Sequence, residues 1–222
     1  MSTETNINFI LRGVAGSHAH GLETENSDID YHGVYSAPSQ DFWKLQQVPD
    51  SIVRKDPDRS YHELRKFLLL GLKSNPTILE LLYLNEYEEK EPGWGDMLLD
   101  IRSDLLSASA VKSAYLGYAN AQMKRMKARS FEGQPKRDKL LRHSFRLLNQ
   151  GLELYTKGRF QTKVVNRNFY FDLPSLSPEV IEDMYRKGIE RFDKSESFLP
   201  EYPNYPAIEE YLVSYRRSHL HG

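Results

Sequence analysis

The chain has 222 residues, of which 39% are apolar and 27% are charged. This balance is typical of a globular protein with a packed core and excludes an intrinsically disordered chain. Thirty basic residues stand against 31 acidic ones, and the resulting net charge of −1 does not select a partner. The sequence contains no cysteine, which excludes disulfides, cysteine-based zinc sites and a thiol nucleophile.

Neither a membrane span nor a signal peptide is visible in the sequence. The longest apolar run, residues 67–72, includes Gly71 and is far too short to cross a bilayer. The chain starts with a polar, acidic stretch, whereas a signal peptide is first basic and then apolar. We therefore expect a soluble cytoplasmic protein.

The first third of the chain has the alternating pattern of β-strands. Apolar and polar residues alternate over residues 7–15, up to a turn at Gly16, and alternate again over residues 28–35. A third short strand is expected at residues 51–53 or 58–61.

Beyond residue 60 the spacing of apolar residues predicts helices. In the clearest of them, leucine or an aromatic residue recurs every three or four positions from Leu141 to Tyr155. Asn75 followed by Pro76 is typical of a helix start. Residues 166–175 are expected to form a loop or a short strand. Other helices are expected near residues 64–72, 77–87, 94–107, 110–129, 178–192 and 206–218.

These elements predict an α+β (α/β) fold in which a small mixed sheet is followed by a helical half. We expect residues 1–90 to form a catalytic core and residues 91–222 to form a helical region that packs on it.

A candidate site lies where the first two predicted strands meet. Gly16 and Ser17 follow directly on a strand, and such a turn offers backbone N–H groups and a hydroxyl to a phosphate. Asp28 and Asp30 are two residues apart on the second predicted strand, so their carboxylates share a face and need a counter-charge. Mg²⁺ or Mn²⁺ suits such oxygen ligands and leaves positions open for substrate phosphates.

This stretch resembles the nucleotidyltransferase superfamily typified by DNA polymerase beta, whose signature is a Gly-Ser turn, an Asp-x-Asp strand and a later carboxylate. More narrowly, the chain is similar to nucleotidyltransferases of the RNA-repair-associated RlaP / YcgL type over residues 7–190. Further matching blocks lie downstream of the Asp-x-Asp strand, at residues 41–45, 63–67, 75–76, 80–82 and 139–158. The sequence departs from the pattern at His20, where these proteins usually carry an aromatic residue.

The resemblance implies roles for individual residues. Asp28 and Asp30 bind two Mg²⁺ (or Mn²⁺) ions, and Gly16 and Ser17 hold the β- and γ-phosphates of a nucleoside triphosphate such as ATP. Asp58 matches the third carboxylate best, with Asp56 and Glu63 as competitors. Lys139 and His143 are candidates for a second wall that neutralises the leaving pyrophosphate.

The basic residues of the chain are concentrated in one segment. Residues 112–146 contain ten Lys or Arg against two acidic residues. Arg142 and Arg146 are expected to face away from the apolar stripe of their helix. The segment is therefore a candidate wall for the backbone of a nucleic acid, although a solvated charged face gives the same pattern.

The function expected from these features is metal-dependent transfer of a nucleoside monophosphate from a nucleoside triphosphate to an acceptor hydroxyl, with release of pyrophosphate. The acceptor is expected to be RNA or tRNA. Two alternatives remain open at this point: the same transfer to a protein or small-molecule hydroxyl, and a catalytically silent module that binds nucleotide or RNA.

Overall fold

A computed structural model describes residues 7–220, except 46, 56 and 128–134. The described residues form one five-stranded sheet with the order β3-β4-β2-β1-β5. Strands β2 and β4 are parallel and the other neighbours are antiparallel, so the sheet is mixed, as the sequence predicts. Both candidates for a third strand are strands. The bounds are β1 (Asn8–Ala15), β2 (Asp30–Ser36), β3 (Ser51–Arg54), β4 (Arg59–Glu63) and β5 (Glu89–Lys90).

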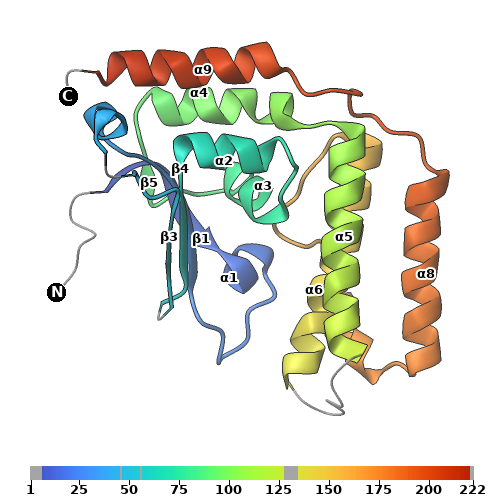
Figure 1. The fold of residues 1–222 in the computed structure, drawn as a ribbon. Helices are drawn as coiled ribbons and strands as arrows, with labels where there is room; N and C mark the ends of the chain where they lie inside the picture. Colours follow the sequence, from blue (N-terminus) through green and yellow to red (C-terminus); the bar gives the residue numbers. More distant parts are fainter. Residues whose placement is uncertain (1–6, 46, 56, 128–134, 221–222) are drawn as a thin grey trace.

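Helices dominate the chain after β4, and the fold class is α+β (Figure 1). The helices are α1 (Gly16–His20), α2 (Leu64–Gly71), α3 (Pro76–Leu82), α4 (Trp94–Asp100), α5 (Ala108–Lys127), α6 (Pro135–Lys157), α7 (Arg167–Asp172), α8 (Pro178–Lys194) and α9 (Tyr205–Ser218). Short 3₁₀ turns cover Ser39–Trp43, Ile101–Leu105 and Leu173–Ser175. Within the described ranges, none of these helices combines the length and apolarity that crossing a membrane requires.

Local signals in the sequence set the ends of several helices. The side chain of Asn75 accepts a hydrogen bond from the amide of Thr77, with Pro76 in the first turn of α3. Helix α6 ends before Gly158, which adopts the left-handed conformation (φ 64°) that glycine tolerates best.

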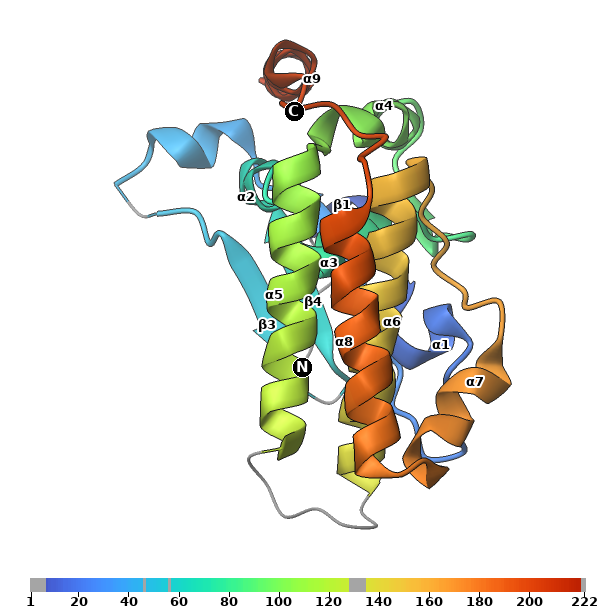
Figure 2. The same cartoon turned by 90° about the vertical axis from the view of Figure 1, so that its right-hand side faces the viewer.

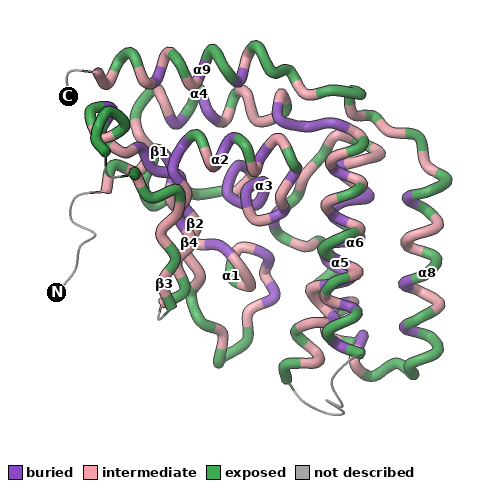
Figure 3. Tube along the Cα trace, viewed as in Figure 1, coloured by how far each residue is buried: buried purple, intermediate pink, exposed green. Residues whose placement is uncertain are grey.

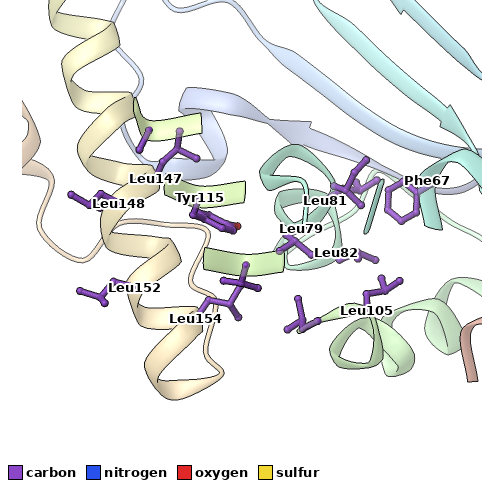
Figure 4. Packing of buried hydrophobic residues seen from close by; sticks show 14 of the residues in the cluster. Phe67, Leu79, Leu81, Leu82, Leu105, Tyr115, Leu147, Leu148, Leu152 and Leu154 are labelled. Carbon is purple, nitrogen blue, oxygen red and sulfur yellow. The ribbon is translucent and has the colours of Figure 1, made fainter. Parts of the chain in front are cut away.

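Helices α5, α6 and α8 stand side by side as a bundle next to the sheet (Figures 1 and 2). Helices α2 and α3 lie between this bundle and the sheet, and the buried positions form one continuous core through all of these layers (Figure 3). In Figure 4 the leucines of α3 lie between Phe67 of α2 and the residues of the bundle, with Tyr115 on α5 and Leu147 on α6. Each such leucine stabilises the fold by roughly 1.5–3 kcal/mol relative to an exposed one. One core thus joins helix α6 to the half of the chain that carries the sheet.

The expectation of a loop or strand over residues 166–175 is wrong, because helix α7 occupies much of this stretch. The side chain of Asn166 accepts a hydrogen bond from the amide of Phe169 and so caps the helix. Tyr170 is buried, and the ring of Phe169 packs edge-on against Phe145 of α6. Three aromatic residues follow one another at 169–171, which hides the spacing of a helix in the sequence. The helix packs them next to α6.

Helix α9 returns from the bundle to the catalytic half. The guanidinium of Arg216 forms an ion pair with Glu63, the residue that caps α2, and donates a hydrogen bond to the hydroxyl of Ser36. The hydroxyl of Tyr215 donates to Glu91 at 2.9 Å. The chain end thus stabilises the junction of β2, β4 and α2.

Candidate active site

The Gly16-Ser17 turn lies against the first residue of β2. Gly16 has a positive φ of 65°, and a Cβ atom built on it would lie 1.9 Å from Oδ2 of Asp30. The residue must therefore be glycine both for its backbone conformation and for the space that the carboxylate occupies. The hydroxyl of Ser17 has no hydrogen-bond partner among the described residues, which leaves it free to meet a ligand.

Strand β2 begins at Asp30, two residues later than predicted. Ala15, the last residue of β1, pairs with Asp30, and the chain leaves the sheet at Gly16, so nothing remains for Asp28 to pair with. Asp28 is exposed in the loop that precedes β2. The argument that Asp28 and Asp30 share a strand face is therefore wrong, although both residues remain at the same end of the sheet.

Asp58 lies beside Asp30 because β2 and β4 run parallel. Tyr31 pairs with Arg59, and the amide of Tyr31 donates to the carbonyl of Asp58 at 2.8 Å. Burial raises the pKa of Asp30, and the charge of Asp58 acts in the same direction, while Lys139 opposes both. Two adjacent carboxylates that disfavour each other's charge fit a divalent cation.

The described residues do not form a ready-made metal cage. No group of three or more histidine and acidic side chains among them lies close enough together to hold an ion. Mg²⁺ is commonly bound through one or two carboxylates together with water and substrate phosphates, and the pair of Asp30 and Asp58 fits that mode.

Glu63 is not an alternative to Asp58. It lies at the opposite end of β4, is 2% exposed, and accepts a hydrogen bond from the amide of Arg65 while it pairs with Arg216. The suggestion that it is a third catalytic carboxylate is wrong, because these contacts hold it away from the site. Asp56, the other competitor, lies outside the described residues.

A polar stripe of α6, formed by Lys139, His143, Arg146 and Gln150, faces the catalytic half. Lys139, the first residue of the stripe, is exposed and lies close enough to Asp30 to lower the pKa of its carboxyl group. Gln150, the last residue of the stripe, is buried and donates hydrogen bonds to the carbonyls of Gln161 and Thr162. Lys139 thus brings one end of the stripe near Asp30, and its role as a second wall stays a prediction.

Arg146 does not face outward, so the expectation that it contacts nucleic acid is wrong. It is 4% exposed and donates to Oε1 of Gln150 at 2.5 Å and to Nδ1 of His143 at 2.9 Å. Helix α6 packs on α5 and α8, and Arg146 lies close enough to Glu80 of α3 for its charge to lower the pKa of that carboxyl group. Arg142 is half-buried, with its guanidinium 4.7 Å from the ring centre of Phe171.

His143 is a neutral side chain, so it does not supply positive charge to a leaving group. Burial, and then the charge of Arg146, lower its pKa to about 3. Since its Nδ1 accepts a hydrogen bond from Arg146, the proton of the neutral ring lies on Nε2. His143 therefore offers a hydrogen-bond donor in place of a cation.

Glu80 and its partner His20 lie next to the Gly16-Ser17 turn. In the sequence Glu80 falls in a matching block and His20 at a departure from the family pattern, but neither was assigned a role in the site. The amide of Gly16 donates to Oε1 of Glu80 at 2.5 Å, which withdraws this N–H group from phosphate binding. Oε2 of Glu80 lies 3.1 Å from Nε2 of His20. One signal was available: Glu80 is a single acidic residue among the leucines of an otherwise apolar helix.

Comparison with known proteins agrees with this geometry. Residues 1–174 match RlaP, described as an RNA repair pathway DNA polymerase beta family. The chain belongs to this family. The RlaP family is one of polymerase beta-like nucleotidyltransferases, and the match includes the turn, the carboxylates and the polar stripe of α6.

The other comparisons add little to the RlaP assignment. No curated protein matches the chain. Among solved structures, a nucleotidyltransferase-like protein from Exiguobacterium sibiricum 255-15 is similar at 12% identity and a TM-score of 0.29, over 97% of this chain and 75% of that chain.

Proposed function

We propose that the protein transfers a nucleoside monophosphate from a nucleoside triphosphate to a hydroxyl of an RNA acceptor and releases pyrophosphate. The observation that carries the proposal is the contact of Asp30 with the Gly16 turn, with Asp58 beside it and Lys139 opposite. Phosphate-binding and acidic groups converge here from four separate elements, as phosphoryl transfer requires.

The residues of the chain have distinct tasks in this proposal. Asp28, Asp30 and Asp58 hold Mg²⁺, which activates the acceptor hydroxyl and stabilises charge on the triphosphate when bound. Ser17 contacts the terminal phosphates with its free hydroxyl. Lys139 adds positive charge beside the leaving pyrophosphate.

An RNA acceptor is favoured by the basic end of the bundle. Five basic residues on the last turns of α5 and the first turns of α6 have no acidic partner among the described residues, and Lys139 connects them to the carboxylates. We call this group the basic tip; its members are Lys124, Arg125, Lys136, Arg137 and Lys139. Unpaired positive charge beside a catalytic centre suits a phosphate backbone. The RlaP family is that of an RNA repair pathway, which points the same way.

The proposal is tested by following which molecule receives a labelled nucleoside monophosphate. The protein is incubated with each α-labelled nucleoside triphosphate, Mg²⁺ and total RNA, and label is expected in the RNA fraction together with free pyrophosphate. Asp30→Asn is the matched control: it keeps the shape of the side chain, and we expect it to fold normally and to lose transfer. Label in protein or in a small molecule instead would favour the alternative acceptor. No label with any triphosphate would identify a silent binding module.

A further inference from the structure

Glu80 is a buried carboxylate for which the proposed chemistry has no use. It lies on α3, directly beneath the Gly16-Ser17 turn, and is 5% exposed. Burial alone raises the pKa of a carboxyl group, but the neighbouring His20, and then His32 and Arg146, outweigh it and lower the pKa of Glu80 to about 2. A charged group in this position requires an explanation, because an uncompensated buried charge is strongly destabilising.

One oxygen of Glu80 fixes the turn. Its Oε1 accepts a hydrogen bond from the amide of Gly16 at 2.5 Å, and a bond to an ionised acceptor is stronger than one between neutral groups. The same Gly16 is in van der Waals contact with the carboxylate of Asp30, since no space is left for a Cβ atom between them. The position of Gly16 therefore governs both the phosphate turn and the orientation of a metal-binding carboxylate.

The other oxygen of Glu80 connects the turn to the helical wall. Oε2 lies 3.1 Å from Nε2 of His20, an ion-pair contact without hydrogen-bond geometry that requires a protonated imidazole, and Nδ1 of His20 donates to the carbonyl of Thr162 at 2.9 Å. That carbonyl also accepts from Gln150, which in turn accepts from Arg146. The amide of Val164 donates to the carbonyl of His20 and closes a second link to the same loop. The turn is thus tied to the stripe that carries Lys139 and His143.

We propose that Glu80 is a positioning residue that holds the Gly16-Ser17 turn for the triphosphate and couples it, through His20 and Thr162, to the wall formed by α6. This inference rests on the proposed function for its ligand, the triphosphate. It also specifies which groups contact that ligand: the hydroxyl of Ser17 does so, and the amide of Gly16 does not.

The test compares Glu80→Ala with Glu80→Gln, and Glu86→Ala serves as an exposed control on the loop that follows α3. The first readout is the ¹H,¹⁵N signal of Gly16, whose amide proton lies downfield and exchanges slowly while it bonds to a carboxylate. The second is the affinity for each nucleoside triphosphate in the presence of Mg²⁺, with KM and kcat measured separately.

Glu80→Ala is expected to shift the Gly16 signal upfield, to speed its exchange and to weaken triphosphate binding about tenfold, the equivalent of one hydrogen bond to a charged group. Because the turn holds the triphosphate before and during the reaction, KM should rise more than kcat falls. Glu80→Gln keeps an oxygen that faces Gly16 and should restore most of the affinity, while Glu86→Ala should change neither readout.

Unchanged Gly16 exchange and unchanged triphosphate affinity in both Glu80 variants would overturn the inference. If Glu80→Ala does not fold, Glu80→Gln decides alone, because its neutral oxygen must still give an upfield shift of Gly16 and a smaller loss of affinity. A protein that binds triphosphate with the expected Glu80 dependence but transfers nothing would contradict the proposed function and leave this inference supported.

Discussion

Nη2 of Arg146 donates a hydrogen bond to Nδ1 of His143 at 2.9 Å, and this contact fixes the tautomer of the imidazole. A neutral histidine whose Nδ1 accepts a hydrogen bond from a guanidinium must carry its own proton on Nε2. Arg146 therefore determines what His143 can offer at a pH near neutrality, which is a neutral ring with a hydrogen-bond donor at Nε2.

A histidine held neutral in the folded chain makes stability depend on pH. The folded pKa of His143, about 3, lies below its ordinary value of 6.5, so the unfolded chain binds more protons between these values and the stabilisation is lost as the pH falls. We expect the free energy of unfolding to decrease between pH 6.5 and 5, with at most about 1.4 kcal/mol per pH unit from this residue. His143→Gln should reduce that slope in urea denaturation series. An identical slope in the variant would show that His143 is not buried in its neutral form.

Arg146 and Arg142 are expected to differ sharply in their contribution to stability. Arg146→Met leaves Glu80 with less compensating charge and removes a partner from Gln150 and His143, which should cost on the order of 3 kcal/mol or more. Arg142→Met removes a contact with Phe171 and should cost about 1 kcal/mol or less. Chemical denaturation of both variants measures the difference. Equal losses would contradict the buried placement of Arg146.

Gly16 and Gly21 provide a matched pair of substitutions. Both have φ near 65°, so an alanine at either position carries the left-handed penalty of roughly 1–2 kcal/mol. At Gly21 the new methyl group meets only the flexible side chain of Lys163, whereas at Gly16 it collides with Oδ2 of Asp30. Gly16→Ala should therefore abolish nucleotide transfer and Gly21→Ala should retain most of it. Comparable activity in the two variants would argue that Asp30 is free to move away from the turn.

The basic tip should govern RNA binding separately from triphosphate binding. Lys124→Glu with Arg125→Glu should weaken RNA binding and reduce the slope of log affinity against log salt by about one unit per lost phosphate contact. Triphosphate affinity should stay constant, because these two residues lie on α5, whereas the Gly16 turn belongs to α1. Lys187→Glu with Arg191→Glu on α8 is the control of equal charge. An unchanged salt slope in the tip variant would exclude this surface as the RNA contact.

Local patterns predicted the parts of the site that depend on neighbouring residues. The alternation before Gly16 and the Asp-x-Asp motif placed the turn and Asp30 together because the two strands are adjacent in the chain and in the sheet. The start of α3 at Asn75 and the end of α6 at Gly158 were likewise visible as capping signals.

The errors arose from long-range packing. An apolar stripe identifies one buried face of a helix, but Arg146 is buried outside that stripe, where its charge acts on Glu80 of α3. Glu63 was assigned to the wrong neighbourhood because its partner, Arg216, is 153 positions away. Glu80 was given no role because its partners, Gly16 and His20, lie on α1, 64 and 60 positions before it, and no spacing rule connects them.

The ion pair between Arg216 and Glu63 has a practical consequence for anyone who shortens this protein. The family match ends at residue 174, yet the guanidinium that balances a carboxylate deep in the catalytic half comes from α9. A chain cut at 174 would lose that cation together with the rings of Tyr211 and Tyr215 that cover Trp94. The boundary recognised by sequence similarity is therefore not the boundary at which the catalytic half can be separated intact, and truncated versions should extend to at least residue 218.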